Sequence, residues 1–552
     1  MALIEFQDIN FTYPGDSENV LSHITFSIEE GEFVLLIGPS GCGKTTLIRQ
    51  LLPTICPYGS REGEITFDGQ SVMEMEDMAL AKTFGFVGQN PSAQIVTDKV
   101  WHELAFGMEN LGLSHDVMER RIAEICEFFG IQGIIDRDVE SLSGGEMQMV
   151  HLAAVMVMEP KVLVLDEPTA YLDPICARNF LDMIKRINTE LGTTVILVEH
   201  HLEEVYGMAD KVVAMKKPGI HSTGTPKEVA EVLEFKSGLP SALIIAKGVD
   251  ENAEDLPLTV SEGQRWIKKL LGDPEEAVRT FSDHKLTSSG EAEVIKAINI
   301  SFAYNDSDIV LEDCNLTIYE GEIFALLGGN GTGKSTLLQV LCQTLKQSFG
   351  KIEIFGRKVK DIKDAPLGFE GMVYLPQDPM ALFTEITVGE ELMEAMSGLS
   401  EHLPDKERQV SEMLKKLGLE EFEKHHPYDL SAGQKQLLAL GKLLLLRPRI
   451  ILMDEPTKGL DFDRKTEIGT VIKDLQKEGI TILMVSHDIE FCARYATRCA
   501  VMHAGRVVAS SDTREFFAGN KFFTTASSRI ARRYEPNAIL PEEVISFCRR
   551  IV

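Results

Sequence analysis

The feature that most constrains the fold is a phosphate-binding loop motif that occurs twice. The two copies read GPSGCGKTT at residues 38–46 and GGNGTGKST at residues 328–336. Each copy follows a short apolar run, at residues 32–37 and 323–327, and each opens an amphipathic run. A strand, a glycine-rich loop and a helix in this order are the context that the motif requires. We therefore predict two loops that bind phosphate groups through backbone N–H groups at a helix N-terminus.

The residue types in both loops suit a nucleoside triphosphate and its cation. Glycines let successive N–H groups turn toward the phosphate chain, the lysine reaches the β- and γ-phosphates, and the hydroxyl that follows it holds Mg²⁺. The predicted contacts are Gly38, Gly41, Gly43, Lys44, Thr45 and Thr46 in the first copy, and Gly328, Gly331, Gly333, Lys334, Ser335 and Thr336 in the second.

Composition narrows the class of protein. The chain has 552 residues and a net charge of -30, which disfavours a nucleic-acid backbone as its main partner. Its nine cysteines form no C-x-x-C pair, so no zinc or iron–sulfur site is indicated and a reducing compartment is favoured. We see neither a signal-peptide pattern nor an apolar run near the roughly 18 residues of a spanning helix. We expect a cytoplasmic protein, which a membrane protein can still recruit.

The two loops belong to a long internal repeat. Lys44 and Lys334 lie 290 residues apart, and the other landmarks recur at offsets of 287 to 291. The chain is therefore predicted to hold two copies of one domain, each with a tail. The predicted boundaries are 1–236 for the first domain, 237–290 for a helical extension and linker, 291–516 for the second domain and 517–552 for a helical C-terminal extension. In the tails, residues 241–247 and 256–262 resemble residues 527–533 and 538–543 as short helices, and the linker itself is expected at 272–290.

Each copy opens with an alternating apolar run, at residues 2–9 and 294–300, which predicts a strand. Tyr13 and Tyr304 follow these runs, just upstream of the phosphate loops. We predict that each tyrosine stacks on a purine ring. The alternative is an aromatic residue that lies at a strand edge for structural reasons alone.

A glutamine recurs downstream of each loop, as Gln89 and Gln377, at the end of a predicted short strand and before a proline-containing turn. A glutamine in that place can put its carbonyl oxygen on Mg²⁺ and its amide near the attacking water. The proline and the neighbouring Asn or Asp also suit a plain turn, so this signal is weak by itself.

A helical region in each copy, at residues 100–130 and 388–418, leads to LSGGE at 142–146 or LSAGQ at 430–434. Because helical sequence follows, Ser143 and Ser431 are predicted to be N-caps. The free N–H groups of a helix that starts in this way also form an anion site. The residues predicted to contact nucleotide here are Ser143, Gly144, Gly145, Ser431 and Gly433.

Two adjacent carboxylates follow a continuous apolar run in each copy, at residues 161–166 and 450–454, which predicts a buried parallel strand. Such a pair is costly to bury without a cation. We assign Asp166 and Asp454 to Mg²⁺, and the next residues, Glu167 and Glu455, to the general base that polarises water. Including the hydroxyls and glutamines, the predicted metal-site residues are Thr45, Gln89, Asp166, Ser335, Gln377 and Asp454.

A histidine ends a further buried strand in each copy, as His200 and His487. It can hydrogen-bond the γ-phosphate and sense its loss. A single histidine at a strand end is more often structural, but repetition at the same offset favours the catalytic role.

In this order, the motifs resemble the ATPase domain of ABC proteins, twice and over nearly the whole chain. The resemblance implies an α/β, RecA-like core with an antiparallel β-subdomain and a helical subdomain, ATP and Mg²⁺ as cofactors, and ATP hydrolysis. It further implies that the two domains close head to tail, as a pseudo-dimer within one chain. Site one would combine Tyr13, Lys44, Thr45, Gln89, Asp166, Glu167 and His200 with Ser431 and Gly433, and site two Tyr304, Lys334, Ser335, Gln377, Asp454, Glu455 and His487 with Ser143 and Gly145.

Three residues depart from the family pattern. Ala432 replaces a glycine of the LSGG motif, Glu146 replaces the usual glutamine, and Glu199 precedes the histidine. None of these changes removes a catalytic group, so two competent sites are expected. The Ala432 methyl group, near the γ-phosphate of site one, is a possible source of inequality between the sites.

Within the family, QNPSAQIVT at residues 89–97, ELAFGMENLG at residues 103–112 and the helical tails resemble the ATPases of energy-coupling-factor importers. This resemblance implies two partners, a transmembrane coupling subunit and a small substrate-binding membrane subunit, and a place on the inner face of the cell membrane. It implies a vitamin, a vitamin precursor, or cobalt or nickel ions as the substrate. The competing class is a non-transport tandem ABC ATPase that acts on ribosomes or nucleic acid, but residues 241–290 hold six Lys/Arg and nine Asp/Glu and no basic helical linker.

The segments at residues 92–97 and 380–384 directly follow the two glutamines and mix small and apolar side chains. We predict that they form a groove for a helix of the membrane partner, with Ile95 and Phe383 as contacts. Ordinary interdomain packing is the alternative.

Overall fold

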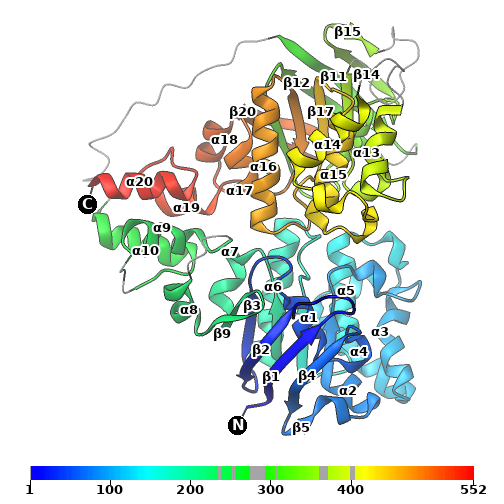
Figure 1. The fold of residues 1–552 in the computed structure, drawn as a ribbon, viewed down its shortest axis with the longest axis vertical. Coiled ribbons are helices and arrows are strands. Elements are labelled where there is room, and N and C mark those ends of the chain that lie inside the picture. Colours follow the sequence, from blue (N-terminus) through cyan, green and yellow to red (C-terminus); the bar gives the residue numbers. More distant parts are fainter. Residues whose placement is uncertain are drawn as a thin grey trace. The chain divides into compact units, whose positions relative to one another are not determined.

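The computed structural model describes residues 2–233, 238–251, 253, 255–273, 292–305, 309–359, 371–397 and 405–551. Within it the chain forms two compact units, Met1–Gly263 and Gln264–Val552 (Figure 1). Most of the predicted linker, residues 274–290, lies outside the described residues.

The first unit is built on two sheets. One is antiparallel, with the order β2-β1-β4-β5, and the other has the order β10-β9-β3-β8-β7-β6, in which only β10 runs antiparallel to its neighbour. The strands are β1 (Ile4–Thr12), β2 (Leu21–Ile28), β3 (Phe33–Ile37), β4 (Ser60–Phe67), β5 (Gln70–Ser71), β6 (Phe84–Val87), β7 (Val162–Asp166), β8 (Thr194–Val198), β9 (Lys211–Lys216) and β10 (Gly219–Gly224). Every residue of β3, β7 and β8 is buried, which explains their uninterrupted apolar sequences.

The second unit repeats this topology strand for strand. Its sheets have the orders β12-β11-β14-β15 and β16-β17-β18-β13-β19-β20. The strands are β11 (Glu293–Ala303), β12 (Ile309–Tyr319), β13 (Ile323–Leu327), β14 (Phe349–Ile354), β15 (Arg357–Lys358), β16 (Met372–Leu375), β17 (Ile450–Asp454), β18 (Thr481–Val485), β19 (Arg498–His503) and β20 (Arg506–Asp512). The predicted α/β fold and the internal repeat are confirmed.

Helices cover the sheets and form the subdomains. In the first unit they are α1 (Lys44–Arg49), α2 (Asp77–Thr83), α3 (Val100–Asn110), α4 (His115–Phe129), α5 (Gly144–Met156), α6 (Pro174–Leu191), α7 (Leu202–Val205), α8 (Pro226–Val232), α9 (Ser241–Val249) and the start of α10 (Val260–Leu271), which continues into the second unit from Gln264. In the second they are α12 (Lys334–Leu341), α13 (Val388–Ser397), α14 (Lys406–Leu417), α15 (Ala432–Leu444), α16 (Phe462–Lys477), α17 (Ile489–Tyr495), α18 (Thr513–Gly519), α19 (Ala526–Ala531) and α20 (Pro541–Ile551). No helix in the described part of the chain is both long and apolar enough to cross a membrane.

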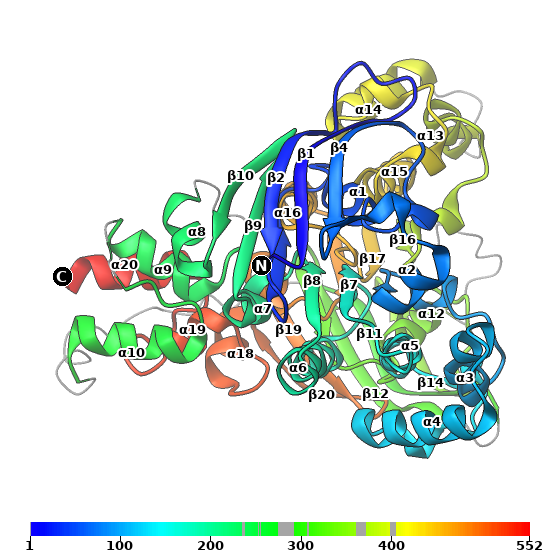
Figure 2. The ribbon, with the colours of Figure 1, turned by 90° about the horizontal axis from the view of Figure 1, so that it is seen from below.

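The predicted helical regions are present in both units. Helices α3, α4 and α5 pack on one another, and both views show them side by side, away from β9 and β10 (Figure 2). Helices α13, α14 and α15 form the same arrangement of contacts in the second unit. Both tails hold two short helices, of which α9 and α19 lie close to the predicted ranges, whereas α10 and α20 begin later and run further than predicted.

The structure corrects where four predicted residues lie relative to their strands. Strands β6 and β16 end two residues before Gln89 and Gln377, and strands β8 and β18 end two residues before His200 and His487. These side chains therefore belong to the turns that follow, at the carboxyl edge of the parallel sheet. That edge is where open α/β sheets bind their ligands.

The structure also shows that Phe383 is wrongly predicted as a partner contact. Its side chain is only 9% exposed and lies in the apolar core of the second unit with Val388 and Leu392. The short helical turn before it, Pro379–Leu382, directs the ring inward. Val96, within residues 92–97, is 64% exposed, and Ile386, two residues after the segment 380–384, is 71% exposed.

His151 on α5 makes the first unit sensitive to acid. The side chain is 6% exposed, neither ring nitrogen has a hydrogen-bond partner within the described part of the chain, and desolvation lowers its pKa to about 4. Because the unfolded chain takes up this proton near pH 6.5 and the folded chain does not, stability is lost as the pH falls from 6.5 toward 4. Between pH 7.5 and pH 5 the loss amounts to about 2 kcal/mol.

We expect His151→Leu to remove that loss in urea unfolding followed at pH 7.5 and pH 5, whereas His115→Leu, at an exposed position of α4, should keep it. An unchanged pH dependence in His151→Leu would show that His151 is protonated in the folded unit.

Two candidate nucleotide-binding sites

The two phosphate loops have the same backbone conformation. Gly38 and Gly328 adopt φ values of 151° and 154°, and a Cβ atom on either would lie 2.5 Å from the carbonyl oxygen of Met215 or Met502. Helices α1 and α12 each begin directly after a left-handed glycine, with φ of 100° and 97°. Only glycine fits these positions, and the loop that results presents its N–H groups at a helix start.

The lysine of each loop is buried against the loop's own carbonyl oxygens. Lys44 Nζ donates to Gly38 O at 2.8 Å and to Pro39 O at 3.1 Å. Lys334 Nζ donates to Gly328 O at 2.9 Å and to Gly329 O at 2.8 Å. Both ammonium groups therefore lie within their own phosphate loops, where they are predicted to bind the β- and γ-phosphates.

The hydroxyl and carboxylate assigned to Mg²⁺ meet in both units. Thr45 Oγ1 donates to Asp166 Oδ1 at 2.9 Å, and Ser335 Oγ donates to Asp454 Oδ1 at 3.0 Å. Both aspartates are buried, and desolvation raises the pKa of each carboxyl group. A buried carboxylate beside a hydroxyl is a ligand set of the hard-oxygen type that Mg²⁺ prefers, so these residues fit the ion.

The two aspartates have different second partners. Arg49 Nη2 lies 3.8 Å from Asp166 Oδ2, whereas Tyr374 OH donates to Asp454 Oδ2 at 3.1 Å. Gln339 occupies the position of Arg49 in the second copy, and Phe86 occupies the position of Tyr374 in the first copy. Each aspartate therefore has a second partner that the other copy lacks.

The glutamate after each aspartate stands on a left-handed backbone, with φ of 48° at Glu167 and 51° at Glu455. Such a conformation costs a non-glycine residue about 1–3 kcal/mol, and the surrounding structure must impose it. Hydrogen bonds from Glu167 N to Val198 O and from Glu455 N to Val485 O, both 2.9 Å, tie the strained turns to the neighbouring strands.

Each glutamate contacts the predicted histidine. His200 Nε2 lies 2.9 Å from Glu167 Oε1, and His487 Nδ1 lies 3.0 Å from Glu455 Oε1. Burial raises the pKa of Glu455 to about 8, against the opposing charge of the Lys334 ammonium. The glutamate predicted to be the general base and the histidine predicted to sense phosphate are thus adjacent in both units.

The glutamines differ between the units. Gln89 Nε2 donates to Glu167 Oε2 at 3.2 Å. Gln377 is exposed, and its side chain forms no hydrogen bond with any described residue. The structure therefore joins the glutamine to the carboxylate in the first unit and leaves it in solvent in the second.

Both tyrosines lie over the start of the loop helix. Tyr13 OH lies 2.9 Å from Thr46 Oγ1, and Tyr304 OH lies 3.4 Å from Thr336 Oγ1. Each ring meets the phenylalanine two residues before it edge to face, with ring centroids 5.0 Å apart. Stacking on a purine stays a prediction.

The predicted N-caps are confirmed. Ser143 caps α5 and Ser431 caps α15, each in a capping box with Glu146 or Gln434 three residues later. The carboxylate of Glu146 accepts the same bond from the capping serine's N–H group as the amide oxygen of Gln434, and this N–H group of Ser143 lowers the pKa of the carboxylate. Glu146 therefore preserves the cap geometry.

The LSGG residues do not reach the phosphate loop of their own unit. The side chains of Ser143 and Ser431 bond only within their caps among the described residues. A Cβ atom on Gly144, the position that matches Ala432, meets nothing within 4 Å in its unit. The Ala432 methyl group is therefore accommodated without a clash inside the second unit.

Four residues near the carboxylates were not predicted as site residues: Arg49, Glu199, Tyr374 and Lys458. Lys458 is half-buried near Asp454 and Glu455, and desolvation lowers its pKa against their opposing charge. The first unit has Ala170 in that place. The sequence does give a signal for these four residues, because the charge or polarity at each position differs from that at the matched position of the other copy.

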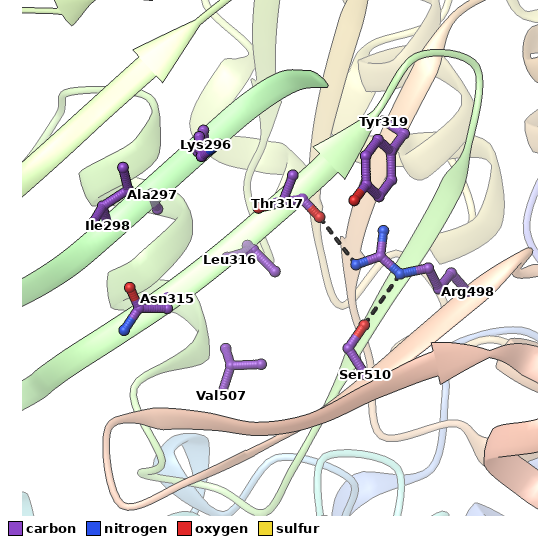
Figure 3. A pocket seen from close by; sticks show the side chains of 10 residues that line it. All are labelled: Lys296, Ala297, Ile298, Asn315, Leu316, Thr317, Tyr319, Arg498, Val507 and Ser510. Carbon is purple, nitrogen blue, oxygen red and sulfur yellow. Dashed lines mark hydrogen bonds between the residues drawn. The ribbon is translucent and has the colours of Figure 1, made fainter. Parts of the chain in front are cut away.

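A cavity of about 340 Å³ in the second unit lies where β11, β12, β19 and β20 meet (Figure 3). Its strongest anion-binding group, Arg498, already donates to Thr317 O at 3.1 Å and Ser510 Oγ at 3.1 Å, and pairs with Glu322 at 3.0 Å. Because these contacts occupy the guanidinium, we interpret the cavity as a packing gap between the two sheets and not as an anion-binding site.

Comparisons with known proteins agree with this geometry. The ABC transporter family model matches residues 21–170 and 311–458, more than half of the chain. A candidate ABC transporter ATP-binding protein of Bacillus anthracis is 40% identical over 100% of this chain and 99% of its own length. A candidate ABC transporter ATP-binding protein of Methanosarcina mazei is 32% identical over 94% of this chain and 90% of its own length.

Among solved structures, an archaeal ribosome recycling factor bound to a ribosomal stalk protein covers 93% of this chain and 91% of its own, with a TM-score of 0.57 and 20% identity. This similarity shows a shared two-domain fold. Family models match both halves, and both halves carry the phosphate loop and the buried Asp-Glu pair. The chain therefore belongs to the ABC transporter family of ATP-binding proteins and is a tandem ABC ATPase.

Proposed function

We propose that this chain is the ATP-hydrolysing pair of domains of an importer of the energy-coupling-factor type, placed on the inner face of the cell membrane. The observation that carries the proposal is the sequence of the segments after the first glutamine, at residues 89–97 and 103–112, together with the helical tail of each unit. The partners would be a transmembrane coupling subunit and a small substrate-binding membrane subunit. The substrate class that follows is a vitamin, a vitamin precursor, or cobalt or nickel ions.

In the proposed cycle each ATP lies between the two domains. Lys44 and Lys334 hold the phosphates, Thr45 with Asp166 and Ser335 with Asp454 hold Mg²⁺, and the LSGG serine of the opposite copy closes each site. Bound Mg²⁺ supplies charge neutralisation on the phosphates. Glu167 and Glu455 accept a proton from the attacking water, while His200 and His487 orient these carboxylates and contact the γ-phosphate.

The segments proposed for docking are held by a buried glutamate in each unit. Glu103 Oε2 accepts hydrogen bonds from the backbone N–H groups of Val96 and Thr97 at 3.2 and 3.0 Å. Glu391 Oε1 accepts bonds from the N–H groups of Thr384 and Glu385 at 2.5 and 2.6 Å. These bonds fix the backbone beside the exposed side chains of Val96 and Ile386, a suitable base for a docking surface.

We expect the double variant Val96→Glu with Ile386→Glu to lose membrane recruitment and substrate uptake by about tenfold or more, because a partner's apolar helix would have to bury a carboxylate. ATP binding by the isolated chain should not change. The matched control is Val232→Glu with Val508→Glu, two exposed apolar residues in the same units. The measurement is co-purification with the membrane subunits and uptake by membrane vesicles.

If the docking variant still co-purifies and drives uptake, the docking surface lies elsewhere. If the wild-type chain sediments with ribosomes and ignores membranes, the chain is instead a non-transport tandem ATPase.

A further inference from the structure

Glu199 is a buried carboxylate to which the proposed cycle gives no role. It follows β8, directly precedes His200, and is 2% exposed. Its Oε1 accepts hydrogen bonds from the backbone N–H group of Thr169 at 3.2 Å and from its hydroxyl at 2.5 Å. Its Oε2 accepts a bond from the backbone N–H group of His200 at 3.1 Å. One side chain thus joins two turns that are distant in the sequence.

These two turns flank the general base of the first unit. Thr169 lies two residues after Glu167, and its turn is closed by a bond from Leu172 N to Thr169 O at 3.0 Å. The other turn carries His200, whose Nε2 lies 2.9 Å from Glu167 Oε1. Any relative movement of the two turns would therefore change the geometry between Glu167 and His200.

The environment makes Glu199 costly to bury. Desolvation raises the pKa of its carboxyl group, and the negative charge of Glu167 acts in the same direction, against the bonds from Thr169 and His200. Buried carboxylates are tolerated when hydrogen bonds satisfy their oxygens. Here the described bonds come from only two residues, one on each turn. The carboxylate therefore keeps all of its bonds only while the two turns stay at this spacing, and its bonds in turn hold them there.

The second unit joins the matching turns by a different bond: the backbone N–H group of His487 donates to Glu455 Oε2 at 3.3 Å. Ser486 occupies the position of Glu199, and its hydroxyl accepts a bond from the backbone N–H group of Asp488 at 3.0 Å, within the same turn. No hydrogen bond joins Ser486 to Thr457, the counterpart of Thr169, in the described part of the chain. Asp488 instead pairs with Lys465 of α16 at 2.6 Å.

We propose that Glu199 is a positioning residue that couples the turn after Glu167 to the turn of His200 in the first ATPase site, and that the second site works without this coupling. The two sites are then unequal because of this side chain. The inference rests on the ATPase activity of the family and is independent of the transport proposal. Since the hydrogen bonds of Glu199 go to Thr169 and His200 and not to the phosphate loop among the described residues, its loss should lower turnover and leave ATP affinity unchanged.

The test compares three full-length variants. Glu199→Ser installs the residue of the second unit, Glu199→Gln keeps the shape and one acceptor oxygen, and Ser486→Ala is the matched control. We expect kcat of Glu199→Ser to fall to half of the wild-type value or lower, with KM for ATP within twofold. Glu199→Gln should retain more activity, because its amide oxygen still accepts from Thr169. Ser486→Ala should keep more than 80% of kcat.

Hydrogen exchange supplies a direct readout of the coupling. In Glu199→Ser, amides in residues 167–173 and 199–203 should exchange faster together, by about tenfold, whereas Ser486→Ala should affect only its own turn. The proposal is overturned if Glu199→Ser keeps more than half of kcat, if KM for ATP rises more than twofold, or if the two segments respond separately. If Glu199→Ser fails to fold, Glu199→Gln carries the test, and kcat and exchange equal to wild type would overturn it.

Discussion

Replacing Glu167 and Glu455 together by glutamine should lower ATP turnover by on the order of 10² or more, the range expected when a general base is lost. Glutamine keeps the volume of the side chain and still hydrogen-bonds its neighbours, but it cannot take a proton from water. The structure places the two carboxylates 2.9 Å from His200 and 3.0 Å from His487, respectively, at the carboxyl edge of the sheet. The ATP-binding residues of the loops are left intact, so nucleotide binding should persist.

The matched control for this variant is Glu190→Gln with Glu478→Gln, which changes two surface glutamates that pair with Arg186 and Lys416. It should hydrolyse ATP at the wild-type rate. Turnover is measured by phosphate release and binding by nucleotide fluorescence. Undiminished hydrolysis in the double variant at residues 167 and 455 would rule out these glutamates as the bases, and a loss of binding would assign them to nucleotide affinity.

Changing Ser431 to arginine should lower hydrolysis at least tenfold, because nucleotide at the Lys44 loop then binds only weakly and the site over it cannot close. Ser431 caps α15 at an exposed helix N-terminus, and among the described residues it forms no hydrogen bond with the phosphate loop of its own unit. In the proposed head-to-tail closure this terminus contacts the ATP of the other copy, and a long cationic side chain would block it. Ser143→Arg should have the corresponding effect on the second site.

Arginine at this position also removes a helix cap, which costs about 1 kcal/mol, so Ser431→Ala is needed as a control for stability. The alanine variant loses the cap without adding bulk and should keep most of the activity. Equal losses in the arginine and alanine variants would mean that the cap alone matters. Full hydrolysis by separately expressed halves, each a monomer, would contradict closure between the copies.

The sequence predicted the elements whose residues repeat. The buried strands β7 and β17, the capping serines and the loop glycines are specified by local patterns that occur at the same offset in both copies. The continuous apolar runs predicted buried parallel strands, as β7 and β17 are. The sequence also assigned Asp166 and Asp454 to the same Mg²⁺ sites as the loop hydroxyls, so it predicted that these groups lie close together.

The sequence did not predict what depends on packing between distant segments. Phe383 is an apolar residue of a segment that was predicted to dock a partner, but its ring lies in the core around Leu392. Gln377 repeats Gln89 in the sequence, yet only Gln89 reaches a carboxylate. The role of Glu199 depends on Thr169, thirty residues earlier, and no local pattern joins the two.

Native mass spectrometry of the full chain carrying Glu167→Gln and Glu455→Gln, with Mg²⁺ and ATP, tests most directly that one chain holds two composite sites. We predict a monomer of 61.3 kDa carrying two ATP molecules, with Ser431→Arg and Ser143→Arg each reducing the tightly held ATP to one. A dimer of chains as the ATP-bound species, or one ATP per chain in the absence of the arginine changes, would contradict the account.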